Sequence, residues 1–185
     1  MTNFIEQYKI DKNLCDEILE YRKTRPSGEG LIANDIVDKS RKDSIDSSFN
    51  KSDLIYEKYI SELDKCLIKY TNKYTVTSKR LTLLEDTNIQ FYPPGGGFKV
   101  YHHELDRYQF PADKRILVFM TYLNDVYIGG QTECLFQKKS FRARKGRTLI
   151  WPTDWTHIHR GKVAPFEEKA IVTGWIHESN EINPT

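Results

Sequence analysis

The sequence predicts a mainly β domain, a sandwich or barrel, with supporting helices at its N-terminal end. Apolar residues recur at helical spacing only before about residue 80, whereas short β-rich runs separated by turn residues occupy the rest of the chain. A chain of 185 residues, of which 38% are hydrophobic, can bury one substantial core. We therefore expect a single domain over residues 1–185, with helical support over 1–80 and a β core over 81–178.

Two helices are expected in the N-terminal part. Asp11 can cap a helix over residues 12–22, where apolar side chains recur every three or four positions. A second helix, over residues 52–72, carries an apolar stripe that consists of Ile55, Tyr59, Leu63, Cys66, Leu67 and Tyr70. Residues 25–51 contain Pro, Gly and clustered polar residues, so an irregular connection is expected there.

The β core is predicted from five short runs rich in β-branched and aromatic residues. They cover residues 88–92, 98–102, 115–123, 148–151 and 170–176. Turns between them are expected at residues 93–97, 129–130 and 145–146, where glycine and proline gather. Because no helical pattern separates these runs, they favour a sandwich or barrel over an alternating α/β fold.

Composition narrows the possible functions. Lys and Arg number 28 against 26 Asp and Glu, and because both signs are mixed along the chain, no basic face for nucleic acid is expected. No signal-like N-terminus and no window of roughly 18 apolar residues is present, which predicts a soluble cytoplasmic protein without a membrane partner. Cys15, Cys66 and Cys134 are odd in number and widely spaced, so we expect reduced, buried thiols.

A candidate metal site begins at His102. In a strand, residues two apart share a face, so His102 and Glu104 would project together while His103 points away. Such a pair occurs readily by chance, and its weight comes from the order of the residues that accompany it further along the chain. A histidine from a remote strand would complete two imidazoles and one carboxylate, leaving metal positions open, an arrangement that suits non-haem Fe(II).

The second histidine is either His157 or His159, since these two also lie two residues apart. His159 is favoured because it stands in a His-Arg-Gly segment, ten residues before Lys169. A lysine buried near a metal requires an anionic partner, and a ligand carboxylate is a natural one. The residues thus predict a metal site beside a charged anchor for an anionic co-substrate.

Four segments then resemble a known family. Residues 89–175 are similar to the catalytic core of the Fe(II)/2-oxoglutarate-dependent dioxygenases, in the prolyl 4-hydroxylase-like branch. The resemblance is carried by residues 88–92 before the glycine-rich turn, by Tyr-Leu-Asn-Asp and Gly-Gly-Gln-Thr within 122–132, by residues 145–152, and by His159-Arg160-Gly161 with Lys169. They occur in the family's order and cover nearly half of the chain.

The resemblance implies a fold and an activity. The fold would be a double-stranded β-helix, a cupin-like jelly roll, buttressed by the N-terminal α-helices. The enzyme would use Fe(II), 2-oxoglutarate and O2 to hydroxylate an unactivated C–H bond, with release of succinate and CO2. A prolyl or other peptide side chain and a small molecule are both candidate substrates, and neither the resemblance nor the composition indicates an oligomeric state.

The resemblance also implies roles for single residues. His102, Glu104 and His159 would hold Fe(II), and Lys169 would pair with the distal carboxylate of 2-oxoglutarate. Contacts with the co-substrate are expected from three further side chains, those of Tyr92, Tyr122 and Thr173. Trp175 is expected close to the catalytic centre. Glu104 departs from the family, which usually has aspartate here, so the metal's coordination could differ.

Two other classes of function compete with this interpretation. A cupin-like metal enzyme that does not use 2-oxoglutarate would commonly add a further histidine or glutamate ligand and would not need Lys169. A jelly-roll binding module without catalysis is the other alternative, and the complete His, Glu and His set argues against it.

Overall fold

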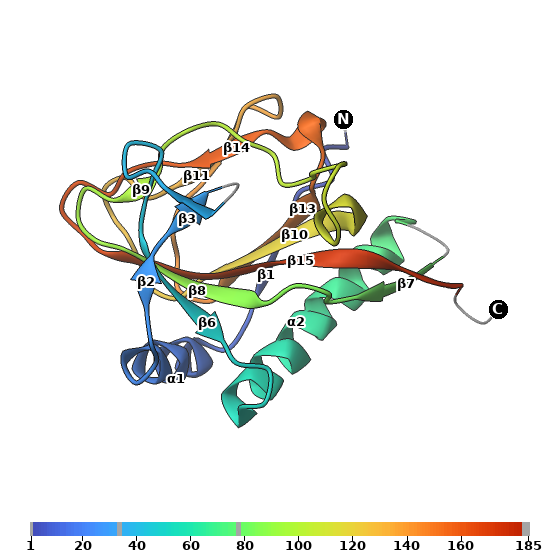
Figure 1. The fold of residues 1–185 in the computed structure, drawn as a ribbon, viewed down its shortest axis with the longest axis horizontal. Coiled ribbons are helices and arrows are strands. Elements are labelled where there is room, and N and C mark those ends of the chain that lie inside the picture. The colour runs from blue at the N-terminus through green and yellow to red at the C-terminus, as the bar shows by residue number, and fades with distance from the viewer. Residues whose placement is uncertain (1, 33–34, 77–78, 183–185) are drawn as a thin grey trace.

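The computed structural model describes residues 2–32, 35–76 and 79–182. Its main feature is a large antiparallel sheet with the strand order β1-β13-β10-β15-β8-β6-β2, to which β7 adds by pairing with β15 (Figure 1). The strands are β1 (Glu6–Lys9), β2 (Gly28–Glu29), β6 (Ile45–Phe49), β7 (Lys79–Thr82), β8 (Thr87–Tyr92), β10 (Arg115–Tyr122), β13 (Arg147–Pro152) and β15 (Lys169–Ile182).

A smaller sheet lies across one face of the large one and has the order β12-β11-β14 (Figure 1). Its strands are β11 (Thr132–Cys134), β12 (Lys139–Phe141) and β14 (His159–Gly161), and two short pairs join β3 (Leu31–Ile32) to β4 (Ile36–Val37) and β5 (Lys42–Asp43) to β9 (Gly97–Phe98). The 3-10 turns are η2 (Ala112–Lys114) and η3 (Trp155–His157). Two antiparallel sheets packed face to face form the jelly roll that the family resemblance implies.

The two helices cover the opposite face of the large sheet (Figure 1). Helix α1 (Lys12–Lys23) begins after Asp11, whose carboxylate accepts a hydrogen bond of 2.8 Å from the Asn13 amide. Helix α2 (Leu54–Lys73) buries the expected stripe, including Tyr59 and Leu63. Both helices therefore agree with the sequence prediction.

Side-chain alternation divides the interior into two cores. On β10, Phe119 packs with the helices, whereas Val118 and Met120 face the smaller sheet. This is the period-2 alternation of a strand that is buried on both faces. It separates a supporting core beneath the large sheet from a second core between the sheets, where a cavity opens.

Two secondary-structure predictions are wrong. Residues 25–51 are not an irregular connection, because β2 and β6 extend the large sheet and β3, β4 and β5 form short pairs. The Asp- and Ser-rich sequence of β6 has low strand propensity, and pairing with β8 decides its conformation. Residues 98–102 do not form a strand either: after Phe98, only an isolated bridge between His102 and His159 is present.

The expectation for the cysteines agrees with the structure. Cys15, Cys66 and Cys134 are buried and unpaired, and burial raises the pKa of each thiol, to about 11, 11 and 12 respectively. These thiols are therefore protonated and unreactive at neutral pH. Within the described residues, no helix has the length and apolar character that crossing a lipid bilayer requires.

Candidate active site

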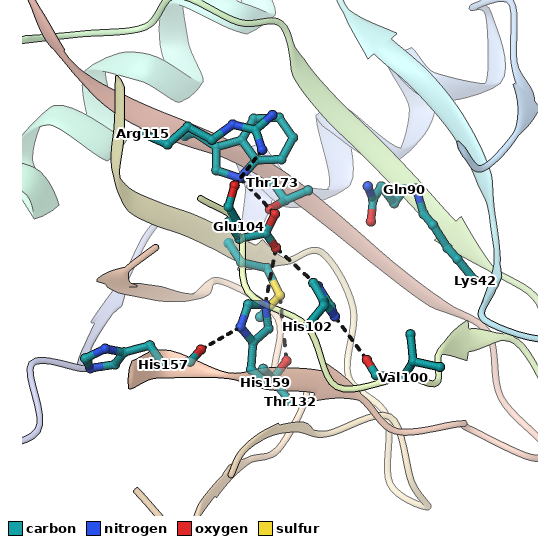
Figure 2. A network of polar contacts seen from close by, with 12 residues as sticks. Lys42, Gln90, Val100, His102, Glu104, Arg115, Thr132, His157, His159 and Thr173 are labelled. Atoms are coloured by element: carbon teal, nitrogen blue, oxygen red, sulfur yellow. Dashed lines mark hydrogen bonds and ion pairs between the residues drawn. The ribbon is translucent and has the colours of Figure 1, made fainter. Parts of the chain in front are cut away.

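Three potential metal ligands converge between the two sheets. The Nε2 atoms of His102 and His159 lie 3.2 and 3.3 Å from the same carboxylate oxygen, Oε1 of Glu104 (Figure 2). The ligand atoms of all three residues lie within 4.8 Å of one another. Two imidazoles and one carboxylate would occupy one side of a metal ion and leave the coordination positions on its other side open. This is the arrangement of non-haem Fe(II) oxygenases.

Main-chain carbonyls orient both imidazoles. Nδ1 of His102 lies 3.0 Å from the carbonyl oxygen of Val100, and Nδ1 of His159 lies 3.0 Å from that of His157 (Figure 2). A carbonyl only accepts, so each Nδ1 carries a proton, and Nε2 is the nitrogen of each ring that can give its lone pair to a metal. Burial, together with the charge of His102, lowers the pKa of His159, which favours the neutral imidazole that metal binding requires.

The backbone around Glu104 is held by neighbouring segments rather than by a strand ladder. His102 exchanges two main-chain hydrogen bonds of 2.9 Å with His159, and the Glu104 amide donates to the carbonyl of Thr153 at 3.0 Å. On the other side, Nη1 of Arg115 donates to the carbonyl of Glu104 at 2.8 Å. The strand-parity argument thus selected His102 and Glu104 although the segment that carries them is not a strand.

The two oxygens of the Glu104 carboxylate have different partners. Oε1 faces both imidazoles, whereas Oε2 accepts a hydrogen bond of 3.1 Å from the indole Nε1 of Trp175. Burial raises the pKa of Glu104, but contacts with His102 and His159 outweigh burial and hold the pKa well below its usual range. The extra methylene that distinguishes glutamate from aspartate is thus accommodated with the carboxylate ionised and one oxygen facing the imidazoles.

Lys169 is a buried cation for which the described residues supply no anionic partner. The residue is only 3% exposed, and within the described part of the chain its ammonium forms no hydrogen bond or ion pair, while the centre of the Tyr92 ring lies 4.4 Å away. Burial lowers the pKa of Lys169 from 10.5 to about 8. A cation held at this cost indicates that the cavity receives an anion.

Gly161 makes room for the Lys169 ammonium. A Cβ at this position would lie 3.2 Å from Nζ of Lys169, closer than ordinary van der Waals contact. The glycine of the His-Arg-Gly segment therefore lets β14 approach the lysine. The three residues His159, Gly161 and Lys169 thus form one structural unit, as their spacing in the sequence suggested.

One face of β15 lines the cavity. Lys169, Ile171, Thr173 and Trp175 alternate with core residues along this strand, and all four contribute to a cavity of about 1360 Å³. Thr173 lies near the metal ligands (Figure 2), and its hydroxyl donates to the carbonyl of Phe119 at 3.0 Å. Lys169 and Thr173 lie four residues apart on this strand and therefore share its cavity face.

The two predicted tyrosines lie in different places. Tyr92 lines the cavity, and its hydroxyl donates to Oε1 of Gln90 at 2.6 Å. The Tyr122 hydroxyl is instead engaged inside the core, 2.6 Å from the hydroxyl of Thr132 and 3.1 Å from the carbonyl oxygen of Phe141. The structure does not bring Tyr122 to the cavity wall, because its hydroxyl is satisfied between the sheets.

The remaining histidines occupy other positions. His157 is buried, and its ring nitrogens contact the Asn3 carbonyl at 2.9 Å and the Thr156 hydroxyl at 2.8 Å, so they are not directed at Glu104. His103 is exposed, as strand parity had suggested. The geometry therefore favours His159 over His157 as the partner of His102.

Several residues of the site were not predicted from the sequence. The Phe98 ring stacks on the His102 imidazole at 3.8 Å, and Trp151 meets His159 edge-on at 5.0 Å. Arg115 contacts both Trp175 and the backbone of Glu104. Phe98 and Trp151 stand close to the histidines in sequence, so proximity was an available signal. The sequence contained no comparable signal for Arg115, apart from its place at the start of an apolar run.

The donor set and the buried lysine together define a class of enzyme. Among the described residues, no fourth histidine, cysteine or acidic residue joins His102, Glu104 and His159. Open metal positions beside an unpaired lysine fit Fe(II) with a chelating dicarboxylate, and they do not fit the fuller ligand set of a cupin-like metal enzyme. The fold and site are those of an Fe(II)- and 2-oxoglutarate-dependent oxygenase.

Comparison with known families agrees with this class. Residues 87–177 match the model of the 2OG-Fe(II) oxygenase superfamily. The matched segment holds the candidate metal ligands and Lys169, and the protein is accordingly a 2-oxoglutarate-dependent oxygenase whose cofactors are Fe(II), 2-oxoglutarate and O2. A search of curated proteins finds no match to the chain.

Solved structures share the fold over nearly the whole chain. A prolyl hydroxylase from Trichoplax adhaerens, in complex with a hypoxia inducible factor peptide fragment, has a TM-score of 0.78 at 18% identity and covers 96% of this chain and 84% of its own. A Pseudomonas putida prolyl-4-hydroxylase has a TM-score of 0.76 at 14% identity, covering 96% and 94%. The viral collagen prolyl hydroxylase of Paramecium Bursaria Chlorella virus-1, in a 2-oxoglutarate complex, has a TM-score of 0.72 at 19% identity, covering 96% and 97%. At these identities the likeness establishes the fold.

Proposed function

We propose that this oxygenase hydroxylates a side chain of a peptide, with a prolyl residue as the first candidate. The observation that carries this proposal is the rim of the cavity, where large aromatic side chains are exposed. Tyr108, Phe110 and Trp155 all line the cavity and are 99%, 72% and 62% exposed. Exposed aromatic residues around a polar pocket are typical of binding surfaces, and aromatic-lined grooves suit extended proline-containing segments.

Relatives of the same fold support a peptide substrate. The Trichoplax adhaerens enzyme is seen with a peptide fragment, and the other two neighbours are prolyl hydroxylases. The cavity volume of about 1360 Å³ exceeds what 2-oxoglutarate alone requires, since drug-sized ligands occupy pockets of about 300–1,000 Å³. Space therefore remains for a substrate side chain beside the co-substrate.

In this proposal each site residue has a role. His102, Glu104 and His159 hold Fe(II), and Trp175 keeps one oxygen of Glu104 occupied so that the other serves the metal. Lys169 binds the distal carboxylate of 2-oxoglutarate from a buried position, where water does not screen the pair. When bound, iron and 2-oxoglutarate would activate O2: one of its oxygen atoms would be added to the C–H bond as a hydroxyl, and the other would enter succinate as 2-oxoglutarate loses CO2.

A turnover assay tests the substrate class. Anaerobically iron-loaded protein is given 2-oxoglutarate and air with proline-containing peptides, the same peptides with alanine in place of proline, or free amino acids. We expect peptide-stimulated succinate formation and an added oxygen atom on the proline-containing peptides. Stimulation by free amino acids alone would contradict a peptide substrate, and succinate formation with none of these additions would still report the oxygenase reaction.

We also propose a cytoplasmic location, which fits the three unpaired buried cysteines. Oxidising compartments favour disulfides, and an odd set of shielded thiols is compatible with a reducing one. Cell fractionation of the tagged natural protein tests this proposal. Recovery from the medium or from a membrane fraction would contradict it.

A further inference from the structure

A second polar cluster lies beside the metal ligands. Glu85 accepts a hydrogen bond of 2.5 Å from Nε of Arg115 and a further contact from Nη2, so the pair is bidentate. Nε2 of His177 lies 2.8 Å from the same carboxylate. The Leu84 amide donates to Nδ1 of His177 at 3.3 Å, which assigns the imidazole proton to Nε2, facing Glu85. We call Glu85, Arg115 and His177 the arginine cluster.

A break in strand register turns Arg115 toward this cluster. On β10, Val118 and Met120 line the cavity, so uninterrupted alternation would direct Arg115 to the opposite face. The pairing with β15 shifts between Arg115 and Leu117, which is typical of a β-bulge, and Arg115 becomes the partner of His177. Bulges beside active sites commonly redirect a side chain, and here the shift places Arg115 on the cavity face.

Arg115 then contacts Glu104 by two routes. Nη1 donates to the main-chain carbonyl of Glu104 at 2.8 Å, directly above the ligands (Figure 2). The guanidinium also lies 3.7 Å from the ring centroid of Trp175, whose indole N–H donates to Oε2 of Glu104. All three guanidinium nitrogens therefore have partners, and both the backbone and the carboxylate of Glu104 depend on where Arg115 lies.

The burial of the cluster separates it from the ordinary surface ion pairs of this protein. His177 is completely buried, and the side chains of Arg115 and Glu85 are 15% and 20% exposed, whereas those of Lys58 and Glu17 are about half exposed. Removing one partner of a buried pair leaves an uncompensated charge, so such a geometry is held more firmly than a surface pair. The cluster is thus largely buried and fully hydrogen-bonded where it meets its neighbours.

We propose that the arginine cluster positions Trp175 and the backbone of Glu104 so that a glutamate serves as the carboxylate ligand through one oxygen. This inference rests on the proposed function, in which Glu104 holds the metal. A glutamate side chain has one more rotatable bond than aspartate and must be restrained to offer a single oxygen in a fixed direction. The indole N–H supplies that restraint, and Arg115, anchored by Glu85 and His177, fixes the indole.

Cobalt(II) titration of the metal-free full chain tests this proposal without using turnover. The affinity and the visible d–d absorption of Co(II) are measured for wild type, Arg115→Gln and Glu85→Gln. Loss of groups that orient metal ligands typically weakens binding about 10–100-fold, so we expect both variants to bind Co(II) at least about tenfold more weakly with an altered spectrum. Arg115→Lys should not restore binding, because an ammonium lacks the planar fork. Arg107→Gln removes an equal charge from the cavity lining, at a residue that forms no hydrogen bond or ion pair with the metal ligands among the described residues, and should change neither readout.

A double-mutant cycle separates positioning from folding. Trp175→Phe keeps a ring for stacking but removes the N–H, so Arg115→Gln should cost less Co(II) affinity in the Trp175→Phe background than in wild type. Additive losses would overturn the route through Trp175, and unchanged affinity of Arg115→Gln would overturn the cluster's role. Failure of wild type to bind Co(II) would instead contradict the metal site itself. Melting curves of the metal-free variants show which are folded, and Glu85→Gln supplies the test if Arg115→Gln is not.

Discussion

Replacing Lys169 with methionine is expected to have opposite effects on stability and on co-substrate binding. Methionine has a similar length and an apolar, adaptable side chain, so it can occupy the same space between the sheets. It removes a buried cation that has no hydrogen-bond or ion-pair partner among the described residues, and it removes the proposed partner of the 2-oxoglutarate carboxylate. The same substitution should therefore stabilise the empty protein and weaken the complex.

The magnitude can be worked from the shift in the pKa of Lys169. Burial lowers this pKa from 10.5 to about 8, and a shift of that size corresponds to about 3 kcal/mol at neutral pH. Lys169→Met should raise the free energy of unfolding of the empty protein by up to that amount, or roughly 6–12 °C in Tm for a chain of this length. A carboxylate that pairs with the ammonium returns a comparable free energy, so the Kd for 2-oxoglutarate should rise on the order of 100-fold.

Two measurements on the same samples check this reasoning. Thermal unfolding without ligand reports stability, and calorimetric titration of 2-oxoglutarate into the Co(II)-loaded protein reports affinity. Lys162→Met is the matched control. Lys162 is a half-exposed lysine on the connection between β14 and β15, and its ion pair with Glu133 contributes little to stability. A destabilised but folded Lys169→Met, or one that binds 2-oxoglutarate as tightly as wild type, would refute the reasoning.

The pH dependence of wild type provides an independent check. The folded protein binds the Lys169 proton less tightly than the unfolded chain, so the unfolded state holds more protons between about pH 8 and 10.5. The free energy of unfolding of wild type should therefore rise relative to Lys169→Met across that window. Affinity for 2-oxoglutarate should be nearly constant below pH 7.5 and fall above about pH 8, approaching tenfold per pH unit. A flat profile would contradict a titrating anchor.

Three further substitutions test single contacts. Gly161→Ala places a Cβ 3.2 Å from Nζ of Lys169 and should weaken 2-oxoglutarate binding by about tenfold in calorimetry, whereas unchanged affinity would mean that the ammonium moves aside. Tyr122→Phe removes a hydroxyl bonded to Thr132 and Phe141 and should lower the free energy of unfolding by about 1–2 kcal/mol with little change in 2-oxoglutarate affinity; a large loss of affinity would restore its family role. His159→Gln should abolish Co(II) binding while His157→Gln retains it, and the reverse pattern would exchange their assignments.

Much of the core and the site could be predicted because the decisive features are local. The Asp11 cap and the apolar stripe of α2 depend on residues a few positions apart. Lys169 and Thr173 share a face since side-chain direction in a strand is set by counting residues. The ten-residue separation between His159 and Lys169 likewise identified the buried lysine. The chain between these two residues connects β14 of the smaller sheet to β15 of the large sheet.

Other predictions failed where long-range contacts decide the backbone. The polar strand β6 forms only because β8 pairs with it, and residues 98–102 lack a strand partner beyond Phe98 and His102. The parity argument selected His102 and Glu104, which the structure brings together, but the segment that carries them is not a strand. Their direction is set by hydrogen bonds to Thr153 and Arg115.

The sequence therefore indicated the nature of the chemistry, since histidine occurs only five times in the chain and two of the five, His102 and His159, stand where the family resemblance places metal ligands. The sequence did not indicate which residues hold Glu104 in place. Glu85 and His177 lie 92 residues apart in the chain and meet Arg115 through a shift in strand register, and no local pattern encodes that meeting. Side-chain periodicity is a property of short segments, whereas packing across sheets depends on the complete fold.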